Sequence, residues 1–162
     1  MTGAIIVRGI AAGCLAMAAS TQVAAATATA SFAVTATVQA SCVITATPLA
    51  FGTYSGTQVD ATSTMSVTCT NTTPYNIGLG AGAGSGATVA ARKMTSGAVL
   101  LNYSLSRDAG RSLNWGNTVA TDTLAGTGTG AAQTLTVYGR IAAGQFVTPG
   151  SYTDTIIATV TY

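Results

Sequence analysis

The stretch Ser31–Cys42, SFAVTATVQASC, has an apolar residue at every second position. The alternating series consists of Phe32, Val34, Ala36, Val38, Ala40 and Cys42, and the residues between them are mostly small and polar. A period of two is typical of a β-strand with one buried face. The pattern continues in phase through Cys42, and the connection Gln39–Ser41 has no Gly, Pro, Asn or Asp to reverse the chain. We therefore expect one continuous strand, whose apolar face needs a partner.

The rest of the chain shows more alternating segments separated by Gly and Pro. The pattern predicts a strand at residues 43–56, broken by Pro48. It predicts two strands at residues 63–80, joined by an Asn-Thr-Thr-Pro turn. Three further strands are expected at 98–107, before a turn at Asp108, at 133–141, and from the Pro-Gly turn at 149–150 to Tyr162. Residues 78–91 and 123–133 are rich in small residues and are predicted as loops. The predicted fold class is an all-β antiparallel sandwich.

Composition argues against several classes of function. Charged residues make up 6% of the chain, the net charge is +2, and His and Glu are missing. A His-based catalytic triad is therefore impossible, and the four Asp residues stand apart from one another. With a single lysine, Lys93, the chain has no basic cluster for nucleic acid, and its glycine-rich loop lacks the Gly-Lys-Ser/Thr of a phosphate cradle. We expect no enzyme, no cofactor, no metal site and no nucleic-acid partner.

Residues 1–25 are predicted to be a secretory signal peptide. Arg8 is the only positive charge there, an apolar stretch follows it, and cleavage is expected after Ala25 or Ala26. A membrane anchor would need an apolar run of about 20 residues, which is longer than this one. A lipoprotein signal through Cys14 is the weaker alternative, because little apolar sequence precedes that cysteine. The expected organisation is therefore a signal peptide at 1–25, an extension at 26–40 and a β-sandwich domain at 41–162.

Cys42 and Cys69 remain as a pair once Cys14 is removed with the signal peptide. Both follow apolar residues in strand phase, so their side chains are expected to point inward from two strands. A metal site would need additional ligands, and the chain has no His. In an oxidising compartment this pair predicts a disulfide, worth roughly 3–4 kcal/mol for a loop of this length.

The first and last predicted strands raise complementary problems. The first has no turn that would fold it back, and the last has no following strand to cover its edge. A spare strand and an open edge in one chain favour head-to-tail strand addition between copies, which builds a filament. The alternative, in which the segment folds back onto its own domain, is left open.

Four motifs in this order resemble the spore coat protein U domain family, which includes subunits of archaic chaperone–usher pili: SCVITATPLAFGTYSG, VTCTNTTPYNIGL, LNYSLSRDAGRSLNWGN and TVYGRIAAGQFVTPGSYTDTIIATVTY. The resemblance covers residues 31–162. It implies an incomplete immunoglobulin-like sandwich that lacks its last strand and is completed by a donor strand from another subunit.

The same resemblance implies partners and roles for particular residues. A periplasmic chaperone fills the gap first, and the next subunit replaces it at an outer-membrane usher. By position, Phe32, Val34, Ala36 and Val38 would be the donor residues, and the carboxylate of Tyr162 would be anchored by the chaperone. The family often has an aromatic residue where this chain has Ser106.

The sequence therefore predicts a structural subunit of a surface pilus, exported through the periplasm to the cell surface and assembled with identical or related subunits, in adhesion and biofilm formation. A spore-coat or envelope protein of the same fold is the alternative. A tip adhesin would need a further receptor-binding domain, for which the mature chain has no room. The sequence leaves open whether the subunit would be a major stalk component or a minor adaptor.

Overall fold

The computed structural model describes residues 24–162, so almost all of the expected signal peptide lies outside the described residues. The chain divides into two units, Met1–Ala36 and Thr37–Tyr162. Residues 24–36, the described part of the first unit, form no regular secondary structure, and their side chains are exposed. All eight strands belong to the second unit, and the described residues contain no helix. It follows that no described helix could span a membrane.

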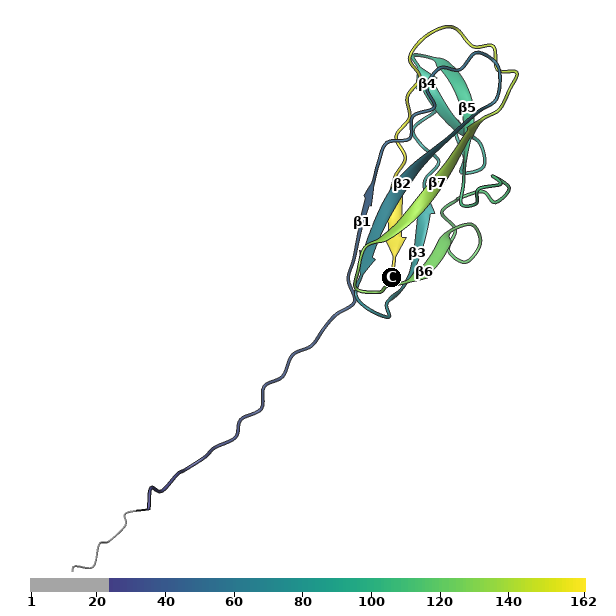
Figure 1. Cartoon of the computed structure of the whole chain (residues 1–162). Coiled ribbons are helices and arrows are strands. Elements are labelled where there is room, and N and C mark those ends of the chain that lie inside the picture. The colour runs from purple at the N-terminus through teal and green to yellow at the C-terminus, as the bar shows by residue number, and fades with distance from the viewer. Residues whose placement is uncertain (1–23) are drawn as a thin grey trace, which may run out of the picture. The chain divides into compact units, whose positions relative to one another are not determined.

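The strands form two antiparallel sheets (Figure 1). The order in the five-stranded sheet is β1 (Cys42–Ala46), β2 (Val59–Cys69), β7 (Gln133–Ile141), β5 (Val99–Ser106) and β4 (Arg92–Ser96). The order in the three-stranded sheet is β6 (Leu124–Thr127), β3 (Pro74–Leu79) and β8 (Ala158–Thr161). β1 and β8 are edge strands of different sheets and lie close to each other. The predicted antiparallel sandwich, of the immunoglobulin-like type, is confirmed.

The core lies between the two sheets because alternating side chains of both sheets point inward. β2 contributes Met65 and Val67, and β3 contributes Ile77 and Leu79, all of them buried. Trp115, in the loop after β5, is completely buried, and its indole Nε1 donates a hydrogen bond of 2.8 Å to the Ile77 carbonyl. This bond satisfies the polar atom of the largest core side chain and ties the loop to β3.

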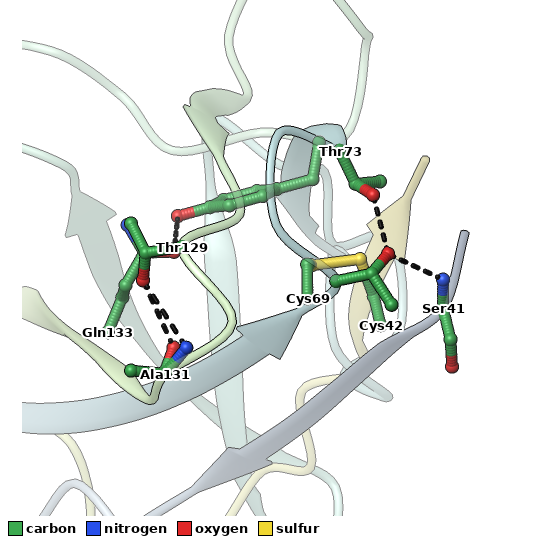
Figure 2. Close-up of a disulfide and its surroundings, with 9 residues drawn as sticks. Ser41, Cys42, Cys69, Thr73, Thr129, Ala131 and Gln133 are labelled. Carbon is green, nitrogen blue, oxygen red and sulfur yellow. Dashed lines mark hydrogen bonds between the residues drawn. A yellow bond between two sulfur atoms is a disulfide. The ribbon is translucent and has the colours of Figure 1, made fainter. Parts of the chain in front are cut away.

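A disulfide joins the first edge strand to its neighbour (Figure 2). Cys42 and Cys69 lie directly opposite each other in the register of β1 and β2, and their sulfur atoms are bonded. Ser41 is held at the same end, since its carbonyl accepts from the Thr70 amide at 2.9 Å and its amide donates to Thr70 Oγ1 at 3.2 Å. The point at which the N-terminal extension joins the domain is therefore fixed.

Four features of the strand pattern differ from the sequence prediction. The continuous strand expected from Phe32 to Cys42 is not found: β1 begins at Cys42, since residues 24–40 have no ladder partner among the described residues. The predicted loop 123–133 contains β6, and β4 was not predicted. The final strand was predicted to begin near Pro149, but β8 starts at Ala158. The stretch before it joins β4 only at the pair Thr95–Thr153, where it crosses from one sheet to the other.

Candidate functional site

An apolar groove opens between the segment that follows β1 and the segment that leads into β8. Its volume is about 450 Å³. One wall is Ala46–Leu49 with Phe51, the other is Tyr152–Ile156 with Ala158, and the inward-facing side chains of both sheets form the floor. The floor residues are Ser63, Met65, Leu79, Met94, Tyr103, Leu105 and Val137. The hydrophobic core thus lies directly beneath an opening along one side of the sandwich.

A second hollow, of about 820 Å³, continues the groove toward the end of the domain away from the disulfide. It lies between residues 49–56 and residues 145–152, with Met94, Leu101 and Ile141 beneath. Leu49, Phe51, Met94 and Tyr152 border both hollows. The two hollows therefore form one open track along the edge of the sandwich.

Among the described residues, the edge of β8 along this track has no strand partner, because β8 pairs there only with β3. The Gly80 amide donates to the Ile157 carbonyl at 2.9 Å, so the main-chain groups of Ile157 point toward β3. Main-chain direction alternates along a strand, and the groups of Ile156, Ala158 and Val160 therefore point to the free edge. The same three side chains are partly buried against the core. This edge offers a strand both hydrogen-bonding groups and an apolar surface.

Polar side-chain contacts fix the position of the groove wall that precedes β8. Asp154 Oδ2 accepts a hydrogen bond of 2.7 Å from the Tyr103 hydroxyl, and its Oδ1 accepts from the Ala83 amide, also at 2.7 Å. Gly82 has a φ of +89°, and a Cβ at that position would overlap the Asp154 carboxylate. The glycine-rich loop therefore matters here because it lets the backbone approach Asp154 closely.

Arg92 of β4 ties the same region together from inside. Its side chain is completely buried, and its guanidinium donates only to main-chain carbonyls, those of Leu79, Gly80, Val89 and Trp115. Burial lowers the pKa of Arg92. Four carbonyls from three separate segments share one cation, so Arg92 fixes the end of β3 beneath the groove.

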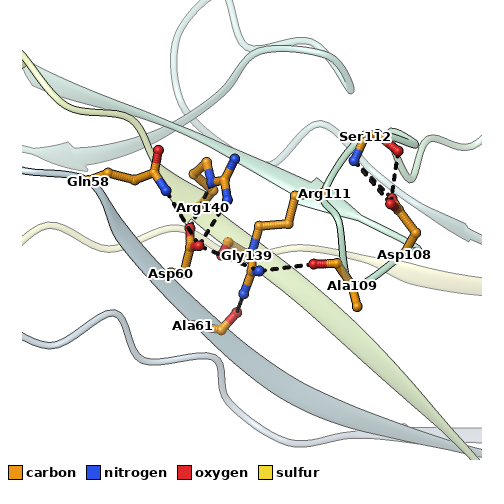
Figure 3. A network of polar contacts seen from close by, with 9 residues as sticks. All are labelled: Gln58, Asp60, Ala61, Asp108, Ala109, Arg111, Ser112, Gly139 and Arg140. Atoms are coloured by element: carbon orange, nitrogen blue, oxygen red, sulfur yellow. Dashed lines mark hydrogen bonds and ion pairs between the residues drawn. The ribbon is translucent and has the colours of Figure 1, made fainter.

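A second polar network lies outside the core (Figure 3). Asp60 of β2 accepts two hydrogen bonds from Arg140 of β7, at 2.7 and 2.9 Å, and forms an ion pair with Arg111 at 3.5 Å. The Arg140 hydrogen bonds hold the pKa of Asp60 below its usual value. Asp108 accepts from the Leu113 amide at 2.7 Å, which confirms its predicted role in a turn. None of these residues lines the groove, and we assign them to the stability of the domain.

The described residues show no arrangement that favours catalysis or metal binding. They contain no cluster of three or more His, Cys, Asp or Glu residues able to hold a metal ion. The groove contains Ser63, but no His or second carboxylate lies beside Asp154 among its lining residues. Its geometry suits an extended apolar segment better than a small polar ligand.

The predicted donor residues have no contacts that would bury them. Phe32, Val34 and Val38 are 84–86% exposed, and Ala36 is exposed as well. Tyr162 follows β8 and is 58% exposed. Their roles as donor residues and as a chaperone anchor therefore stay predictions.

Most of the groove was not identified from the sequence. Ile156, Ala158 and Val160 alternate along the last predicted strand, and in the structure all three are partly buried against the core. The Leu49–Phe51 wall and the Tyr103–Asp154 contact were missed, because they depend on segments far apart in the chain. Period-two alternation continues through Tyr152, Asp154 and Ile156, and this was the available signal.

Both the sequence and the fold of this chain are similar to those of known proteins. Residues 28–159 match the Spore Coat Protein U domain. The chain belongs to this family. It is 38% identical to Protein U of Myxococcus xanthus over 164 residues, which covers 90% of this chain and 91% of that protein.

The fold of this spore coat protein U family member is similar to that of a solved protein. The match is to a chain in the crystal structure of the CsuC–CsuE chaperone–tip adhesion subunit pre-assembly complex, from archaic chaperone–usher Csu pili of Acinetobacter baumannii. The TM-score is 0.58 at 23% identity, and the match covers 78% of this chain. It covers only 40% of the solved chain, so the likeness concerns the fold of one part of that molecule.

Proposed function

We propose that this chain is a structural subunit of a surface pilus, assembled through the chaperone–usher pathway by donor-strand complementation and serving adhesion and biofilm formation. One observation carries the proposal: an apolar track beside an unpaired strand edge occurs in the same chain as an unpaired, exposed segment with strand alternation. An exposed hydrophobic edge is a site for pairing with another chain. The resemblance to the Csu complex chain supports the fold on which this assembly depends.

Donation to another copy is favoured over self-completion by the connection at Ser41. Two hydrogen bonds to Thr70 hold Ser41 at the disulfide end, while the groove extends past Ala46 toward the opposite end. To enter its own groove, the extension would have to reverse within Gln39–Ser41, a tripeptide without Gly, Pro, Asn or Asp. A second copy can offer its extension without that reversal.

The open groove supports the proposal of a chaperone and an usher as partners. Before assembly, the groove leaves partly buried apolar wall residues such as Leu49, Phe51 and Ile156 in contact with solvent, which makes an isolated subunit prone to aggregation. A periplasmic chaperone would cover the groove first, and an outer-membrane usher would exchange it for the next subunit. The expected location is the cell surface, reached through the periplasm after removal of residues 1–25.

Deletion of residues 27–38 tests the proposal. The truncated chain should still fold on its chaperone, because all eight strands remain, but it should not donate a strand, so fibres should stop. A matched control replaces the outward-facing Thr35 and Thr37 with Ser and should assemble normally. Normal fibres from the truncated chain, seen by electron microscopy, would refute strand donation.

A coat or envelope protein of the same fold is the second candidate, and the family's description and the similarity to Protein U favour it. Both candidates can use strand addition, so they differ in where the polymer is found. Immunogold labelling of whole cells and spores separates them: thin fibres projecting from the cell support the pilus, and a continuous shell supports the coat.

A further inference from the structure

The groove contains two positions that restrict which donor residue can lie opposite them. Along its β8 side, the side chains that face inward are Tyr152, Asp154, Ile156, Ala158 and Val160. Asp154 is the only charged member of this series, and Ala158 is the only small one. An incoming strand must therefore offer a small residue to Asp154 and has room for a large one beside Ala158.

Asp154 requires a small neighbour because its carboxylate already has its hydrogen bonds. It accepts from the Tyr103 hydroxyl and from the amides of Ala83 and Thr155, each at 2.7 Å. The carboxylate is partly buried and three of its roughly four acceptor sites are in use, so another polar group beside it adds little. A branched side chain pressed against it would disturb these three contacts and leave polar atoms unpaired.

The expected donor series Phe32, Val34, Ala36, Val38 has the complementary pattern. It contains one small residue, Ala36, and one aromatic residue, Phe32, four positions apart. The acceptor positions Asp154 and Ala158 are also four apart. In an antiparallel pair, residues opposite each other point to the same face, so the two sets can meet side chain to side chain.

We propose that the donor strand enters antiparallel to β8 in a single register, with Ala36 of one copy opposite Asp154 of the next and Phe32 opposite Ala158. This inference rests on the proposed function. The same register puts Val34 against Ile156 and Val38 against Tyr152. A shift of the donor strand by two residues would place a valine opposite Asp154 and would place Phe32 opposite Ile156 or Val160. A shift by one residue would turn the apolar face of the donor strand outward.

The antiparallel direction follows from the two ends of the domain. The extension joins at Cys42, and β8 ends at the same pole, where Thr161 pairs with Asn76 just after the turn that follows Cys69. In a head-to-tail row, the extension of the next copy enters at the other pole, between residues 49–56 and 145–152. Val38 then lies near Tyr152, and Phe32, the N-terminal residue of the donor series, lies nearest the end of β8.

Disulfide trapping in assembled fibres tests the register. The full chain carries Phe32→Cys together with Ala158→Cys, and the matched controls pair Phe32→Cys with Ile156→Cys or Val160→Cys. Under mild oxidation, the 32/158 pair should give a covalent ladder on a non-reducing gel at least tenfold faster than the controls. A faster ladder from a control pair, or intact fibres without a ladder from any pair, would overturn the register.

A substitution series gives a second measurement. Ala36→Leu should reduce fibre yield at least tenfold, whereas Ala33→Leu, on the outward face, should leave the yield within twofold. Asp154→Ala in the same chain should restore at least part of the yield of Ala36→Leu. Normal assembly of Ala36→Leu would contradict the pairing with Asp154.

The outcomes also separate this inference from the function on which it rests. If the unmodified chain forms no polymer, the proposed function fails. If it polymerises but the 32/156 or 32/160 pair is trapped, only the register fails. A bond within single chains, with no ladder, would show self-completion and would overturn both.

Discussion

At the residue scale, Arg92 shows how much of the site depends on a side chain that sequence reasoning passed over. A buried arginine beside four main-chain carbonyls leaves no periodic signal, because its partners come from β3, the glycine-rich loop and the Trp115 loop. The disulfide partners, by contrast, could be predicted, since strand phase and the redox compartment leave few choices. Residues that act through backbone contacts are the ones that sequence patterns miss.

We expect Arg92→Met to destabilise the domain strongly. The substitution keeps much of the volume but leaves buried carbonyls without donors, each of which costs about 1–3 kcal/mol. A loss of roughly 3 kcal/mol or more in the free energy of unfolding is expected from urea titration. Arg140→Met is the control, because its pair with Asp60 lies at the surface, where an ion pair contributes little to stability. Equal losses for both variants would contradict the role given to Arg92.

Tyr103 makes the stability of the domain sensitive to alkaline pH. Burial, and then the hydrogen bond to Asp154, raise the pKa of Tyr103 above its ordinary value of 10.0. Because the folded pKa is the higher one, the stabilisation is complete below pH 10.0 and is lost as the pH rises from there toward the folded pKa. Tyr103→Phe should be less stable at pH 7 but should lose less stability between about pH 10 and pH 11.5. Parallel pH profiles of the two proteins, measured by urea unfolding, would show that this hydroxyl is not involved.

At the scale of elements, the strands with apolar alternation were predictable and the short edge elements were not. β2, β3, β5 and β7 carry the core and show a clear period of two. β6 lies in Leu-Ala-Gly-Thr, whose small residues indicate a loop. It is a strand because Gly126 lies opposite Tyr75 and leaves room for the aromatic ring. The segment 150–157 has strand alternation but crosses between sheets, so it pairs with β4 only at Thr153 before β8 begins at Ala158.

Gly126→Val should detach β6 while leaving the larger sheet intact. A side chain at position 126 would overlap the ring of Tyr75, and overpacking of this kind costs about 1–3 kcal/mol. Hydrogen exchange should show lost protection in β6 and the facing part of β3, with β2 and β7 unchanged. Adding Tyr75→Leu should recover part of the stability by removing the clash. Uniform loss of protection across the domain would contradict a local effect.

At the scale of the whole molecule, neither half of the site has a partner within residues 24–162. The sequence alone predicted both halves, since the extension has strand alternation without a turn and the last predicted strand has an apolar face. The depth of the groove and its second wall were not predictable, because they arise where residues 46–51 lie across from residues 152–158. If the two halves belong to different copies in the assembly, they can be disabled separately.

Two chains, each defective in a different half of the site, should therefore form one pair when mixed but no longer polymer. The chain lacking residues 27–38 keeps its groove but cannot donate, and a chain with Ala158→Trp keeps its extension but fills the groove beside β8. Each alone should give no polymer, because assembly needs both halves in every copy. Mixed, the first should accept the extension of the second, and the pair should stop at two, since neither free end can continue. Native mass spectrometry of the mixture should show a one-to-one pair and no longer species. Polymers from either chain alone, or pairs from the truncated chain with itself, would mean that the copies meet through some other surface.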